Sequence, residues 1–156
     1  CFLALKTKTS TCSDSKMSAS RPLRVQVNEG TSPVYTATLL DYDGEPIPLS
    51  AMDSLVLTLR NTATGAVVNG RENEAILNAG IGSYDETSGL LTVGFTPDDM
   101  AIDTTADTPG DTQPIEATFA AAWYRGMSMP AALTWRVVFD VRNLYAIAKQ
   151  ETPPPT

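Results

Sequence analysis

The chain contains no histidine among its 156 residues. This absence removes the usual general base at neutral pH, the commonest metal ligand and every Ser-His or Cys-His nucleophile pair. No apolar run approaches the roughly 18–20 residues that a membrane helix needs, so no membrane partner is expected. Catalysis by carboxylates or by lysine remains open. The sequence nevertheless predicts a protein that is not an enzyme and that uses no cofactor.

Cysteine is almost as scarce, because Cys1 and Cys12 are the only two in the chain. A disulfide between them would close a short terminal loop outside any expected core, so we interpret both as incidental. The chain starts with Cys1, and Met17 follows a stretch rich in Ser, Thr and Lys. Residues 1–16 are therefore consistent with a tag, a processed remnant or a segment upstream of a start at Met17.

Positive charge is concentrated at one end of an otherwise acidic chain. The net charge is −7, but residues 1–24 carry five basic side chains against Asp14 alone, which gives +4. The remaining six basic and seventeen acidic side chains give −11. Phosphate binding needs clustered Lys and Arg, so the acidic body is not expected to bind nucleic acid. The basic arm, with Lys6, Lys8 and Lys16, is a candidate interaction segment, and the alternative is a solvated tail.

From residue 23 onward, apolar and polar residues alternate with a period of two. This pattern is typical of half-buried antiparallel strands. The expected strands are "LRVQVN", "PVYTATLLD", "SLVLTLRN", "GLLTVGFT", "IEATFAAAWYR" and "LTWRVVFDVRNL". In the last two, Trp123 and Trp135 fall on the apolar face and are the expected bulky core anchors.

Turn signals separate these runs, among them "DYDGEP", "NTATG", "ETSG", "YRGMSMP" and the Asn69–Gly70 pair. Strands punctuated in this way, with no long helical period, predict an all-β fold: an Ig-like antiparallel β-sandwich, with a small barrel as the alternative. The expected organisation is a flexible basic arm over residues 1–21, a sandwich domain over 22–148 and a Pro-rich tail over 149–156.

One short helical turn is expected in "TPDDMAI". Thr96 is a good N-cap, Pro97 suits the first helical position, and Asp98 and Asp99 face the positive end of the helix dipole. Met100 and Ile102 are expected to close one end of the sandwich. The acidic loop over residues 103–114 is long for a hairpin and is predicted to be mobile or to serve as an interaction loop.

Two groups of carboxylates invite a metal hypothesis. In "DYDGEPIPLSAM", Asp41, Asp43 and Glu45 alternate as in a calcium loop, but Gly44 comes two places early and position 12 is Met52. Asp-Gly between β-rich runs is instead a strong turn signal, so the three acidic residues are only weak metal candidates.

A second acidic group follows the expected helical turn. In this group, Asp98 and Asp99 are explained by capping. Asp103, Asp107 and Asp111 are interpreted as solvated loop charges and candidate contact residues.

The turn after the fifth long strand is a further candidate contact. Tyr124, Arg125, Met127 and Met129 form an exposed-looking segment that could bind a partner, and the alternative is a plain hairpin tip. No phosphate-cradling glycine motif, CxxC pair or basic-aromatic stripe accompanies it.

Four segments carry a resemblance to a known family: "YTATLLDYDGEPIPLS", "LVLTLRNTATGAVVNGRE", "AILNAGIGSYDETSGLLTVGFTPDDMAI" and "EATFAAAWYRG" with "WRVVFDVRNL". Over residues 22–148 the chain resembles the Ig-like N-terminal domain of tailed-bacteriophage baseplate upper proteins. The long C-terminal receptor-binding extension of that family has no counterpart here, so a head, neck or tail accessory position is equally consistent. The resemblance implies a virion component that is present in many copies and binds other virion structural proteins.

Two functions from different classes follow. The first is a non-enzymatic virion protein that docks through the 103–114 loop, the 125–130 turn and the basic arm. The second is an extracellular carbohydrate-binding or adhesin module. The second predicts an exposed aromatic platform, with Trp123 or Tyr124 beside Tyr42 or Tyr145.

Overall fold

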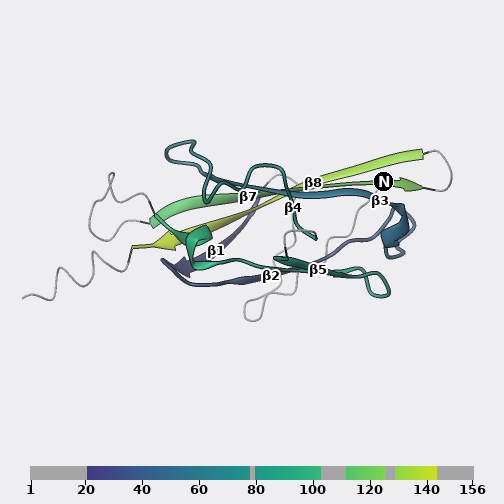
Figure 1. Ribbon diagram of the computed structural model, residues 1–156, viewed down its shortest axis with the longest axis horizontal. Coiled ribbons are helices and arrows are strands. Elements are labelled where there is room, and N and C mark those ends of the chain that lie inside the picture. Colours follow the sequence, from purple (N-terminus) through teal and green to yellow (C-terminus); the bar gives the residue numbers. More distant parts are fainter. Residues whose placement is uncertain (1–20, 78–79, 103–111, 126–128, 144–156) are drawn as a thin grey trace, which may run out of the picture.

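The computed structural model describes residues 21–77, 80–102, 112–125 and 129–143, which form two β-sheets packed face to face (Figure 1). The five-stranded sheet has the order β1-β8-β7-β3-β4 and the three-stranded sheet the order β2-β6-β5. The strands are β1 Leu23–Asn28, β2 Val34–Thr38, β3 Met52–Asn61, β4 Glu74–Ala75, β5 Gly82–Asp85, β6 Leu90–Gly94, β7 Thr112–Arg125 and β8 Met129–Arg142. The predicted all-β sandwich is confirmed.

The strand directions differ from the expectation in one pair. β1 runs parallel to β8, with Leu23 beside Val137 and Asn28 beside Arg142, whereas every other pair in the described part of the chain is antiparallel. Alternation of apolar side chains reports which face a strand buries and not the direction of its neighbour. The sequence also missed β4 and β5, because a two-residue strand and a polar Gly-Ser-Tyr-Asp strand show no alternation to detect.

The two longest strands, β7 and β8, form a hairpin that runs the length of the sandwich (Figure 1). Each strand has fourteen residues, and the buried side chains of β7 fall at every second position from Ile115 to Trp123. The hairpin extends toward the same end as η1 (Leu49–Ala51), a 3₁₀ helix that the sequence did not predict. We call this end, where β7 stops at Arg125 and β8 begins at Met129, the hairpin tip.

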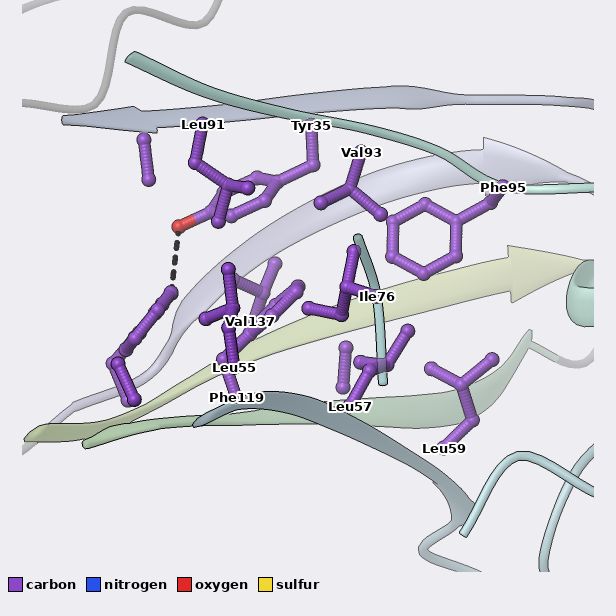
Figure 2. Close-up of a cluster of buried hydrophobic side chains, with 14 of the residues drawn as sticks. Tyr35, Leu55, Leu57, Leu59, Ile76, Leu91, Val93, Phe95, Phe119 and Val137 are labelled. Carbon is purple, nitrogen blue, oxygen red and sulfur yellow. Dashed lines mark hydrogen bonds between the residues drawn. The ribbon is translucent and has the colours of Figure 1, made fainter. Parts of the chain in front are cut away.

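The core lies between the two sheets and is built from the inward faces of all the long strands. Figure 2 shows Tyr35, Leu91 and Val93 of the smaller sheet facing Leu57 and Phe119 of the larger one. Trp123 and Trp135 are 2% and 8% exposed, so the prediction that they anchor the core is confirmed. Among the described residues, no helix combines the length and the apolar character needed to span a membrane.

The predicted helical turn is present as the 3₁₀ helix η2, Pro97–Met100, with Thr96 at its N-cap. The N–H and hydroxyl of Thr96 donate to Asp99 Oδ2 at 2.8 and 3.0 Å. Met100 is fully buried and Ile102 is 9% exposed, so both side chains belong to the core as expected.

Several predicted features lie outside the described residues. They are the basic arm with Lys6, Lys8 and Lys16, the acidic loop with Asp103, Asp107 and Asp111, the turn residue Met127, and the Pro-rich tail.

Candidate functional site

Two features that the sequence presented separately meet at the hairpin tip. The Arg125 side chain at the end of β7 donates from Nε to Asp41 Oδ2 at 3.0 Å and from Nη2 to Asp43 Oδ2 at 2.9 Å. Trp123 Nε1 donates to Asp41 Oδ1 at 3.2 Å. The acidic turn of residues 41–45 is therefore tied to the tip of the larger sheet across more than eighty residues of sequence.

The turn itself is held by its own backbone. Asp41 N–H donates to the Glu45 carbonyl at 2.7 Å, and Gly44 N–H donates to the Asp41 carbonyl at 2.8 Å. Gly44 has a φ of 80°, a left-handed conformation that glycine adopts without a steric penalty. The interpretation of this segment as a structural turn is confirmed.

Aromatic side chains complete the cluster. The Tyr42 ring lies 6.3 Å from the Trp123 ring between centroids, and the Arg125 guanidinium carbon lies 4.9 Å from the Tyr42 centroid. This placement is within the range of a cation–π contact. Tyr42 is 41% exposed, so the outer part of the cluster is open to a partner.

The charges at the tip do not cancel. Burial alone would raise the pKa of Asp41, but hydrogen bonds from the Tyr42 N–H, Arg125 and Trp123 lower it below its ordinary value. Asp41, Asp43 and Glu45 then give −3 against +1 from Arg125, a net charge of −2 for the cluster. The side chain of Asp43 is 75% exposed despite its ion pair.

A pocket of about 490 Å³ opens between the acidic turn and the tip. Its apolar lining comes from Pro46, Ile47, Pro48, Ala51 and Trp123. Three carboxylates, Ser50, Tyr124 and Arg125 make up the polar remainder of the lining. We call this cavity the tip pocket.

In the acidic turn, an arginine side chain competes with any metal ion for the carboxylates. The Arg125 guanidinium occupies carboxylate oxygens of Asp41 and Asp43, the oxygens that a calcium ion would need. In the described part of the chain, no group of three or more carboxylate or cysteine side chains is arranged to hold a metal ion.

Calcium is accordingly expected to leave the melting temperature unchanged. Binding would require the ion to displace a hydrogen-bonded guanidinium from both carboxylates, and a ligand that does not bind the folded state cannot stabilise it. Thermal unfolding with and without excess calcium measures this. A rise of several degrees would restore the acidic turn as a metal site.

The tip also exposes apolar side chains. Tyr124 is 49% exposed and Met129 is 62% exposed, and both were predicted contact residues. Arg125, also predicted as a contact, forms ion pairs with Asp41 and Asp43, and 29% of its side chain is exposed.

A strand edge that no described strand covers adjoins these side chains. On the β1 side of β8, the Arg142 carbonyl accepts from Glu29 N–H at 3.0 Å. Backbone groups of a strand point to alternate sides, so every second residue before Arg142, including Thr134 and Ala132, also directs its N–H and C=O to that side. β1 covers β8 only from Val137 onward, and no strand of the described residues pairs there with Ala132 or Thr134. We define the tip surface as Tyr42, Tyr124 and Met129 together with the β8 edge over residues 130–136.

The carbohydrate hypothesis fares less well at this surface. It predicted an exposed aromatic platform with Trp123 or Tyr124, but Trp123 is 2% exposed and its indole N–H already donates to Asp41. Trp135 is also buried. The platform built on Trp123 is therefore wrong. The alternative with Tyr124 beside Tyr42, which are 49% and 41% exposed, stays a prediction, and Tyr145 lies outside the described residues.

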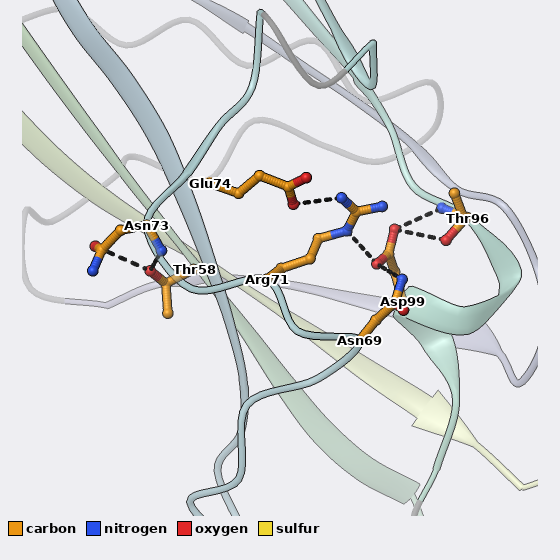
Figure 3. A network of polar contacts seen from close by, with 7 residues as sticks. All are labelled: Thr58, Asn69, Arg71, Asn73, Glu74, Thr96 and Asp99. Carbon is orange, nitrogen blue, oxygen red and sulfur yellow. Dashed lines mark hydrogen bonds and ion pairs between the residues drawn. The ribbon is translucent and has the colours of Figure 1, made fainter.

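A buried ion pair near η2 was missed by the sequence analysis. Asp99 is fully buried and accepts from Arg71 Nε and from Asn69 Nδ2, while Arg71 Nη1 also donates to Glu74 at 2.5 Å (Figure 3). The capping prediction for Asp99 holds, since Asp99 also binds the Thr96 N–H. No local pattern links Arg71 to a carboxylate 28 positions later, so no sequence signal would have identified the pair.

Comparison with models of known protein families gives no match to this chain, and a search of characterised proteins likewise gives none.

Proposed function

We propose that the chain is a non-enzymatic structural or accessory protein of a tailed-bacteriophage particle, located in its baseplate, tail, neck or head. It binds neighbouring virion proteins through the tip surface. The observation that carries this proposal is the combination of exposed Tyr124 and Met129 with a β8 edge that no strand of the described residues covers, at one end of the sandwich. The resemblance of residues 22–148 to the domains of phage baseplate proteins is the reason for proposing a phage particle.

The chemistry of the tip surface suits protein contacts. An unpaired edge offers backbone N–H and C=O groups to an added strand, which gives affinity through main-chain hydrogen bonds. Tyrosine and methionine are enriched at protein interfaces, where their apolar area is buried. Many copies on a symmetric particle would convert weak single contacts into firm attachment.

The hydrogen bonding of three carboxylates suits a structural role. Asp41, Asp85 and Asp99 have pKa values lowered from the ordinary value, in each case by hydrogen bonds to the ionised form. A carboxylic acid that donates a proton near neutral pH needs a raised pKa instead. These three groups are arranged as acceptors in structural contacts.

Particle composition tests the proposal. Quantitative mass spectrometry of purified particles of the encoding phage is expected to detect the chain, and Met129→Lys is expected to lower its copy number several-fold. A lysine at the centre of a contact would need to be desolvated without a partner. Absence of the unmodified chain from purified particles would overturn the proposal.

Val34→Lys is the matched control for this substitution. Val34 is 65% exposed, close to the 62% of Met129, but it begins β2 at the end of that strand remote from the acidic turn. Its substitution is expected to leave the copy number unchanged. Equal losses for the two variants would show that the tip surface is not the contact.

A further inference from the structure

The N-terminal end of β1 faces the end of the sandwich that holds the tip pocket. Because β1 is parallel to β8, its N-terminal residue Leu23 lies beside Val137, and the β8 residues before Val137 lead to Met129 at the tip. Arg21 and Pro22, which precede Leu23, therefore lie at the end of β1 that faces the hairpin tip.

The length of this preceding segment is sufficient to reach the pocket. Val137 lies eight residue steps along β8 from Met129, a distance of about 26 Å at the rise of a β-strand. Lys8 stands fifteen residues before Leu23 and can lie up to about 50 Å from it. Lys16 stands seven residues before Leu23, so its Cα lies at most about 25 Å from that of Leu23 and approaches the tip only if this segment is fully extended.

The charges are complementary. The cluster at the tip carries −2, and residues 1–24 carry +4. The pocket pairs exposed Asp43 and Glu45 with an apolar lining that includes Pro46, Ile47 and Trp123. A lysine suits this lining, because its methylene stem packs on apolar surface while its ammonium meets carboxylates.

We infer that Lys6 and Lys8 bind the tip pocket of their own chain. An exposed ion pair contributes only about 0.2–1 kcal/mol, too little to hold a separate molecule in dilute solution. A segment of the same chain that can span the gap meets the pocket at an effective concentration on the order of millimolar. The inference does not depend on the proposed virion role, since it concerns one chain alone.

The two cysteines provide the probe, because both precede residue 13 and the rest of the chain has none. In a Cys1→Ser variant of the full chain, a nitroxide on Cys12 reports proximity through paramagnetic broadening of amide NMR signals. The amides of residues 42–45 and 124–125 are expected to lose most of their intensity relative to the reduced label. The amide of Val34, at the far end of β2, is expected to keep its intensity.

Lysine substitutions within the segment decide which side chains are responsible. Lys6→Gln with Lys8→Gln is expected to abolish the broadening at the pocket, whereas Lys16→Gln is expected to preserve it. Equal loss for both variants would show attraction by net charge without a defined site, and would overturn the assignment. Broadening that survives Lys6→Gln with Lys8→Gln would do the same.

Substitutions at the pocket give an independent check. Asp43→Asn with Glu45→Gln, both exposed positions, is expected to remove the broadening, and Glu72→Gln, an exposed carboxylate paired with Arg60, is not. In a mixture of spin-labelled unenriched chains and unlabelled ¹⁵N chains, no broadening is expected. Broadening in that mixture would assign the pocket to a second copy and overturn binding within the chain.

Discussion

Asp99→Ala is expected to lower the free energy of unfolding by roughly 3–5 kcal/mol, the cost of removing one partner of a buried ion pair. The substitution leaves Arg71, only 8% exposed, without the acceptor of its Nε–H. It also removes the acceptor of Asn69 Nδ2 and of the Thr96 N–H. Asp99 and Arg71 together connect the loop before β4, η2 and, through the Arg71–Glu74 ion pair, β4. The substitution therefore weakens the contact among all three.

Asp98→Ala is the matched control, because Asp98 is the preceding residue on η2 and is exposed. Its loss is expected to change stability by less than about 0.5 kcal/mol, as for an ordinary surface position. Urea unfolding followed by tryptophan fluorescence measures both variants. A cost for Asp99→Ala as small as that of the control would mean that Arg71 finds another acceptor at no penalty.

The same carboxylate makes stability depend on acid pH. Burial opposes ionisation of Asp99, but the hydrogen bonds from Arg71, Asn69 and Thr96 prevail and lower its pKa below the ordinary 3.8. A group with a depressed folded-state pKa contributes stability that is present above its unfolded pKa and is lost as the pH falls through the folded one. The unmodified chain is therefore expected to lose stability more steeply below about pH 4 than Asp99→Ala does.

The sequence was sufficient for those parts of the fold that are encoded locally. Alternation over residues 115–125 predicted a strand with one buried face, and the structure buries Ile115, Phe119 and Trp123 on that face. The Asp-Gly pair at 43–44 predicted a turn, and Gly44 adopts the left-handed conformation that such a turn needs. In both cases the signal and the structure lie within a dozen residues.

The pairings between distant segments could not be predicted in this way. Nothing in the local pattern shows that Arg125 meets Asp41, or that β1 joins β8 in parallel. Such contacts are selected by the packing of the whole chain, because many registers satisfy the same alternation. The site was therefore visible from sequence as two separate candidates, and only the fold unites them at the tip.

Phe119→Ala is the second substitution with a large expected effect, again roughly 3–5 kcal/mol. Phe119 is fully buried and stacks against two rings, with centroid distances of 5.2 Å to Tyr35 and 5.0 Å to Trp135. Tyr35 belongs to β2 in the smaller sheet and Trp135 to β8 in the larger one. Removing the middle ring opens a cavity between the sheets and ends both stacked contacts.

A polar contact across the same stack gives the substitution a spectroscopic signature. Trp135 Nε1 donates to the Tyr35 hydroxyl at 3.1 Å, and burial raises the pKa of Tyr35 to about 12. If the stack fixes this geometry, Phe119→Ala is expected to lower the Tyr35 pKa toward its ordinary value of 10.0 as water enters. Phe119→Leu, which fills most of the volume, is expected to cost less than half as much stability and to keep the pKa raised. Equal costs for alanine and leucine would mean that aromatic stacking, and not the filled volume, couples the two sheets.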